Sequence, residues 1–155
     1  MKGNEAALLY LSHTDVRRAL PMADAIEAMH AAFLQLSEGR VTMPARSSME
    51  IPEANGVVLI MPCYAAQTHN VSLKLLTQFA DNGRLGLPLI QAVVLLADAV
   101  NGRLLAIMDG SAITALRTGA AGASSGFSSG GDSPRCAASS RVFSWASAGR
   151  YGVAS

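Results

Sequence analysis

Residues 93–123, VVLLADAVNGRLLAIMDGSAITALRTGAAGA, contain the signals that decide the fold. Two apolar runs, at 89–98 and 103–109, flank Asn101-Gly102, a dipeptide typical of a hairpin turn because both residue types tolerate a positive φ. The second run ends at Asp109-Gly110-Ser111, and we expect Ser111 to cap the helix that follows. The stretch therefore predicts a β-hairpin that leads directly into a helix.

The residues before this hairpin predict one helix and three strands. ALLYLS at 7–12 is typical of a strand, GVVLIMPCYA at 56–65 of a buried strand that Pro62 stops, and VSLKLLTQF at 71–79 of an alternating strand. Pro21 and Gly39 bracket a helix, whose apolar face consists of Met22, Ile26, Met29, Phe33 and Leu36. We expect an α/β (α+β-like) fold with a helix packed on a mixed, partly antiparallel sheet.

The composition argues against several classes of partner. The chain has 155 residues, 50% of them hydrophobic, and a formal net charge of +1, so we expect neither nucleic acid nor a membrane as partner. Cys63 and Cys136 are far apart and join no histidine cluster, so we expect no disulfide framework and no metal site. No segment has the roughly 20 apolar residues of a membrane span, and the N-terminal apolar run is too short for a signal peptide. We therefore expect a cytoplasmic protein.

The composition changes near residue 123. Residues 1–123 are rich in Leu, Val, Ile and Met, whereas residues 124–155 are dominated by Ser, Gly, Ala and Arg and contain no Leu or Ile. A segment of that kind buries too little apolar surface to offset the entropy lost on ordering. We expect residues 1–123 to fold and residues 124–155 to form an irregular, disordered tail.

Three basic residues stand out as candidates for binding an anion. Lys74 lies mid-strand between two leucines, either on a solvated face or as a cationic anchor whose pKa is lowered by desolvation. Arg117 is the one charged residue between positions 109 and 132, so it needs either a bound anion or a carboxylate in a buried ion pair. Arg46 follows Pro44 in a loop, where arginines are usually solvated. If the three converge, they would recognise a carboxylate.

Other signals for chemistry are weaker. Cys63, after Pro62, is either a nucleophile or a buried, inert thiol. The chain has no GxGxxG turn, P-loop or GxSxG motif. Spacing alone therefore assigns no reaction.

Several stretches resemble the N-terminal part of the ornithine cyclodeaminase/mu-crystallin family. The similarity runs from about Leu8 to Ala123 and is most specific in MPARSSM, the lysine of VSLKLLTQF, the L-x-D-x-x-N-G hairpin and AITALRTGAA. The resemblance implies that residues 1–123 form part of a substrate-binding and dimerisation region, which a Rossmann domain for NAD or NADP would follow. It implies redox-assisted deamination, such as ornithine to proline, or the reduction and oxidation of imines and amino acids.

The resemblance also implies roles for individual residues. Arg46, Lys74 and Arg117 match positions that hold the carboxylate and the reacting amino or imino group of the substrate. Thr118 matches a position near the cofactor. The acidic general base of the family lies in the later half of full-length members, so no catalytic residue is expected here. A small amino-acid or imino-acid carboxylate and a second copy of the chain are the implied partners.

The tail departs from the resemblance and leaves three hypotheses. After residue 123 the family continues towards a glycine-rich Rossmann turn, whereas this chain continues as SSGFSSGGDSPRC, which suggests a shifted reading frame. The chain would then be a truncated, inactive family member that binds no cofactor itself. The alternatives are a non-enzymatic fragment and a small carboxylate-binding module with a tail.

Overall fold

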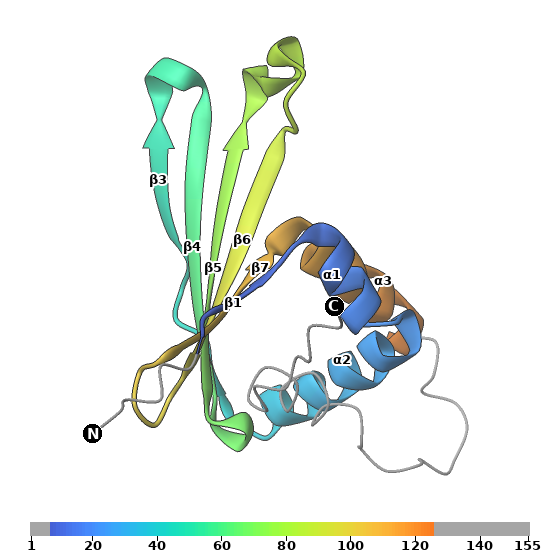
Figure 1. The fold of residues 1–155 in the computed structure, drawn as a ribbon. Helices are drawn as coiled ribbons and strands as arrows, with labels where there is room; N and C mark the ends of the chain where they lie inside the picture. The colour runs from blue at the N-terminus through green and yellow to red at the C-terminus, as the bar shows by residue number, and fades with distance from the viewer. Residues whose placement is uncertain (1–6, 126–155) are drawn as a thin grey trace.

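The computed structural model describes residues 7–125, which form a mixed sheet with helices packed on one face (Figure 1). The helices are α1 (His13–Ala19), α2 (Met22–Ser37) and α3 (Gly110–Ser125). The strands are β1 (Leu9–Leu11), β2 (Val41–Thr42), β3 (Ser47–Ile51), β4 (Gly56–Ala65), β5 (Asn70–Phe79), β6 (Ile90–Asp98) and β7 (Leu104–Asp109). This arrangement confirms the expected fold class. The sequence predicts a tail that begins at residue 124, whereas α3 extends to Ser125; residues 126–155 of the predicted tail lie outside the described residues.

The sheet is antiparallel except at one edge. Its strand order is β1-β7-β6-β5-β4-β2, and β3 pairs with β4. β1 pairs with β7 in parallel, while the remaining pairs are antiparallel. β4, β5 and β6 are long neighbouring strands, and their upper ends extend past the helices (Figure 1).

β4 has β5 on one side and two shorter strands on the other. β3 pairs with residues 56–60, and β2 pairs with Tyr64 and Ala65. Pro62 lies between these two partners, and the strand continues through it, so the prediction that Pro62 stops this strand is wrong. Proline lacks an N–H, and it is tolerated in a strand where no neighbour on that side needs the donor.

The hairpin between β6 and β7 forms where the sequence predicts it. Gly102 has a φ of 74°, and the Asp98 side chain accepts hydrogen bonds from Val100 N at 2.7 Å and from Asn101 Nδ2 at 3.1 Å. The loop between the two strands spans residues 99–103 and is therefore longer than a two-residue hairpin turn. Asn101 does not have a positive φ in this loop. Asp98 therefore organises a loop that is longer than the dipeptide signal suggests.

α3 begins one residue before the cap that we expected. Asp109 Oδ1 accepts a hydrogen bond from Ala112 N at 2.6 Å, so Asp109 caps the helix and the assignment of Ser111 is wrong. Gly110 starts the helix against β6, and a Cβ at this position would lie 2.7 Å from the carbonyl carbon of Ala92. Glycine is therefore required for α3 to leave β7 and cross the sheet this closely.

Two helices lie between β1 and β2 instead of the single one predicted. Ser12 caps α1 in a capping box with Asp15, a short-range signal. α2 begins after Pro21, and Gly39, with a φ of 70°, follows its end as expected. α2 packs on α3, and a Cβ at Gly119 would lie 3.3 Å from the methyl carbon of Met22.

The two faces of the sheet have different environments. The helix-covered face carries the buried core, with clusters around Leu11, Val16 and Ala112 and around Leu96, Leu105 and Ala106. No described helix covers the opposite face (Figure 1). We call this surface the open face, and its central side chains are Ile60, Tyr64, Val71, Leu73, Leu75, Val93 and Leu95. Among residues 7–125, no helix is both long and apolar enough to cross a membrane.

Candidate functional site

Lys74 lies on the helix-covered face of the sheet. It pairs with Met61 on β4 and Val94 on β6, and Val94 on this face is 8% exposed. The half-buried Lys74 donates a hydrogen bond through Nζ to Thr114 Oγ1 on α3, at 2.6 Å. The interpretation of Lys74 as part of a solvated face is therefore wrong.

Thr114 orients the ammonium group of Lys74. Its hydroxyl donates to the carbonyl oxygen of Gly110, one turn earlier in α3, at 2.6 Å. Because its proton is committed to that carbonyl, the oxygen presents a lone pair to Lys74. Thr114 is not among the site residues predicted from the sequence. The signal that could have found it is helical spacing, since Thr114 and Arg117 are three residues apart and share a side of α3.

Arg117 brings a second positive charge near Lys74. Burial first, and then the charge of Arg117, lower the pKa of Lys74 below its ordinary value of 10.5. Arg117 is exposed, and the ion pairs of the described residues involve other groups. The alternative of a buried ion pair at Arg117 is therefore wrong for residues 7–125. Two neighbouring cations without a carboxylate between them favour an anion from outside this region.

Arg46 lies immediately before β3, which is separated from β5 by β4. The next residue, Ser47, pairs with Ile60 on β4. The residue after Ile60 is Met61, which pairs with Lys74 on β5. About two strand spacings of roughly 4.8 Å therefore separate the backbones of Arg46 and Lys74. Arg46 is exposed and forms no ion pair within residues 7–125. The structure thus brings Lys74 and Arg117 together and leaves Arg46 nearby in a loop.

Thr118 and Cys63 have less specific surroundings. Thr118 is exposed, and its hydroxyl donates to the carbonyl oxygen of Thr114 at 2.7 Å. Cys63 is half-buried on β4, and burial raises the pKa of its thiol despite a hydrogen bond with Ser72. A raised pKa disfavours the thiolate, so the environment of Cys63 favours the inert thiol over the nucleophile.

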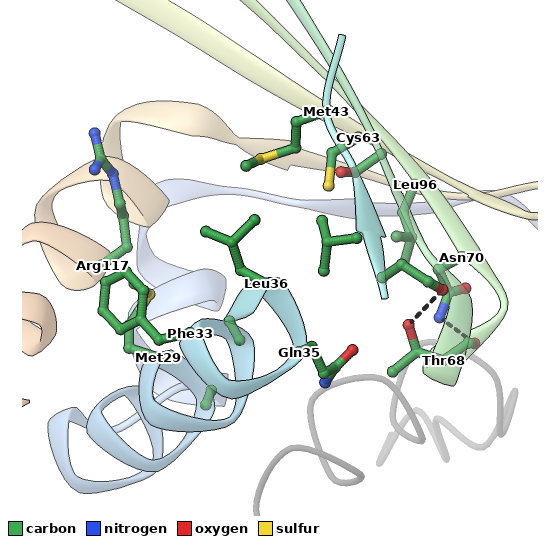
Figure 2. Close-up of a pocket in the computed structure, with 15 residues that line it drawn as sticks. Met29, Phe33, Gln35, Leu36, Met43, Cys63, Thr68, Asn70, Leu96 and Arg117 are labelled. Atoms are coloured by element: carbon green, nitrogen blue, oxygen red, sulfur yellow. Dashed lines mark hydrogen bonds between the residues drawn. The ribbon is translucent and has the colours of Figure 1, made fainter. Parts of the chain in front are cut away.

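A cavity of about 430 Å³ opens beside Arg117. Its walls are α2, with Met29, Phe33 and Leu36, and the sheet, with Cys63 and Leu96 (Figure 2). Arg117 lines one side of this cavity. The cation pair and the cavity therefore share one residue.

Sequence comparison identifies relatives that match the described region. A sequence model of the ornithine cyclodeaminase/mu-crystallin family matches residues 7–127. Ketimine reductase mu-crystallin of Mus musculus is 39% identical over 98 residues, which are 63% of this chain and 31% of the relative. Delta(1)-pyrroline-2-carboxylate reductase of Bacillus cereus is 32% identical over 113 residues, which are 73% of this chain and 35% of the relative. The chain spans about a third of the length of these relatives.

Structural comparison leads to the same group of proteins. The Thermococcus litoralis Delta(1)-pyrroline-2-carboxylate reductase, solved with NADH and L-proline, matches with a TM-score of 0.70 and 37% identity over 74% of this chain and 36% of that protein. An archaeal alanine dehydrogenase dimer with bound NAD matches with a TM-score of 0.69 and 31% identity over 74% of this chain and 35% of that protein. With its family match over most of its length and a mixed sheet shared with these enzymes, the chain belongs to the ornithine cyclodeaminase/mu-crystallin family.

Proposed function

We propose that residues 7–125 bind the carboxylate of a small amino or imino acid, as the substrate-binding part of an NAD(P)-dependent reductase or dehydrogenase. The observation that carries this proposal is the pair of cations, Lys74 and Arg117, with no carboxylate between them in the described region. An anion at this position would relieve their repulsion and accept hydrogen bonds from both. The relative solved with L-proline supports an amino acid as the ligand.

Each basic residue has a distinct part in this proposal. Lys74, held by Thr114, presents a fixed ammonium group. Arg117 adds a planar guanidinium that can bind both oxygens of a carboxylate. Arg46 lies in the loop before β3, from where its side chain would close over the ligand. Holding the carboxylate in this way would fix the position of the neighbouring carbon at which an amino or imino group reacts.

The described region does not fit the diphosphate of a dinucleotide. A diphosphate binds best at a helix N-terminus with free N–H groups and a glycine-rich turn. Here the Asp109 carboxylate caps α3, a capping box with Asp15 closes the start of α1, and Asp24 lies in the first turn of α2, which has no side-chain cap. Each of these helix starts therefore carries a carboxylate, which disfavours a diphosphate. We therefore propose that residues 7–125 bind no NAD or NADP alone, with Thr118 as the residue nearest to a cofactor supplied from elsewhere.

The open face provides a surface for a second copy of the chain. Ile60, Tyr64 and Val71 are 37–39% exposed on it, and an apolar surface of this kind is typical of interfaces. A similar archaeal alanine dehydrogenase is a dimer. We propose that two copies of this chain pack their open faces against each other.

The carboxylate site can be tested by titration of the 155-residue chain with L-alanine and L-proline, by calorimetry or by NMR. We expect Lys74→Met and Arg117→Met each to weaken binding about ten-fold, because each removes one charged hydrogen-bond donor. Arg103→Met, in the exposed β6–β7 loop, is the matched control and should leave binding unchanged. An equal loss in the control, or wild-type protein that binds neither amino acid, would contradict the proposal.

The same samples distinguish an enzyme from a binding module. We expect no calorimetric binding of NADH and no NADH production from NAD with L-alanine. Carboxylate binding without either would favour a binding module or a part of a larger enzyme, as the sequence hypotheses allow. Saturable NADH production by this chain would show that it binds the cofactor and would refute our proposal that it does not.

A further inference from the structure

Besides the pair of cations, the site has a second feature that can bind part of a ligand, the cavity between α2 and the sheet. Its volume of about 430 Å³ is within the range of pockets that hold small organic molecules. Most of the wall is apolar, with the side chains of Met29, Phe33, Leu36 and Leu96 and the thiol of Cys63 among its groups (Figure 2). Such a wall favours an apolar occupant of modest size.

Gln35 adds a polar group to this apolar cavity. It lines the cavity, is only 9% exposed, and forms no side-chain hydrogen bond with any residue of 7–125. A primary amide offers two N–H donors and one carbonyl acceptor to a ligand. No polar side-chain atom of the described residues is both fully inaccessible and unpaired, so the amide of this lining residue is not sealed off within the protein.

The charges around the cavity disfavour a positively charged side chain on the ligand. None of the described lining residues is Asp or Glu, and the one charged lining residue is Arg117. In Figure 2, Arg117 lies on one side of the cavity, and Gln35 lies towards the opposite side, where Thr68 and Asn70 are found. A ligand that extends from Arg117 would thus pass apolar groups and meet an uncharged amide.

We propose that this cavity receives the side chain of the substrate whose carboxylate is held at Lys74 and Arg117. The substrate class is then an amino or imino acid with an unbranched apolar side chain that carries at most one uncharged hydrogen-bonding group, which Gln35 binds. A side chain with a second ammonium group, as in L-ornithine, is disfavoured because nothing in the described lining neutralises it. This inference rests on the proposed carboxylate site.

The test compares amino acids that share a carboxylate and differ in the side chain. Affinities of the 155-residue chain for L-alanine, L-norleucine, 6-hydroxynorleucine and L-ornithine are measured by calorimetry. We expect L-norleucine to bind at least about ten-fold more tightly than L-alanine, because three further methylene groups enter the cavity. We expect L-ornithine to bind at least about ten-fold more weakly than L-norleucine. Gln35→Leu should weaken binding of 6-hydroxynorleucine relative to L-norleucine.

Cys63 reports on the cavity independently of affinity. In a Cys136→Ser background it is the only thiol, and its alkylation by N-ethylmaleimide is followed by mass spectrometry. Saturating L-norleucine should slow this alkylation several-fold, whereas saturating L-alanine should leave the rate unchanged. Equal rates with both amino acids would contradict the placement of the side chain in the cavity.

A blocking variant separates this inference from the carboxylate site. Ala32 is exposed and lines the cavity, whereas Ala23 is exposed on α2 away from it. Ala32→Phe should abolish the advantage of L-norleucine and leave L-alanine binding intact, while Ala23→Phe should change neither. If L-alanine binds in a Lys74-dependent manner but L-norleucine binds no better, the cavity inference fails and the carboxylate site stands. If no amino acid binds, both fail.

Discussion

Replacing Thr114 by valine removes the hydroxyl that Lys74 contacts while it keeps the shape of the side chain. The Thr114 oxygen lies 2.6 Å from Lys74 Nζ and 2.6 Å from the carbonyl oxygen of Gly110. Valine and threonine have similar helix propensities, so α3 should persist in the variant. The change therefore tests the contact between β5 and α3 and not the helix itself.

The magnitude follows from the type of hydrogen bond that is lost. Hydrogen bonds to charged groups contribute about 1.5–3 kcal/mol to stability. Lys74 is only half-buried, so water can replace part of the contact, and we expect the free energy of unfolding to fall by about 1–2 kcal/mol. For a domain of this size, the Tm should fall by roughly 3–8 °C. Affinity for L-alanine should fall about three- to ten-fold, because Lys74 no longer has a fixed orientation.

Two measurements separate this positioning role from a general loss of stability. The pKa of Lys74, followed by NMR of its side-chain carbon atoms, should fall below its wild-type value in Thr114→Val, because the variant removes a hydrogen bond to the charged form. Thr114→Ser keeps the hydroxyl and should restore both the pKa and the affinity. Thr114 has no positioning role if Thr114→Ser behaves as Thr114→Val does, or if the pKa of Lys74 does not change in either variant.

Three further predictions concern the fold, the open face and pH. Gly110→Ala should lower the Tm by more than 5 °C, at a cost above about 1 kcal/mol, because the new Cβ would lie 2.7 Å from Ala92; a Tm equal to wild type would contradict this close packing. Leu75→Lys, on the open face, should convert a dimer into a monomer in analytical ultracentrifugation, and a monomeric wild type would overturn the dimer proposal. Burial and the charge of Arg117 lower the pKa of Lys74 in the folded protein. At pH values between this lowered pKa and 10.5, the unfolded chain therefore binds more protons than the folded protein does. The free energy of unfolding should therefore rise with pH through this window, and Lys74→Met should flatten the rise in a series of urea titrations.

The strands of the sheet could be predicted because local apolar runs define them. Continuous apolar runs indicated β4, β6 and β7, and alternation indicated β5. The end of β4 could not be predicted from Pro62, because its tolerance depends on β2 and β3 leaving a gap beside it. β3 has an exposed, mixed sequence, SSMEI, which becomes a strand only through pairing with β4. These errors therefore arise from contacts between strands, which local sequence patterns do not encode.

The site could be predicted only as far as residue types allow. Lys74 and Arg117 are charged residues in apolar surroundings, and their sequence context already indicated an anion or a partner. Which face of β5 is covered depends on where α3 crosses the sheet, and that crossing requires the absence of a Cβ at Gly110. The same crossing places Thr114 2.6 Å from Lys74, so one glycine determines whether the lysine is an exposed charge or an oriented one. A sequence pattern can identify the charge, but the packing of a helix 40 residues later in the chain decides what that charge can do.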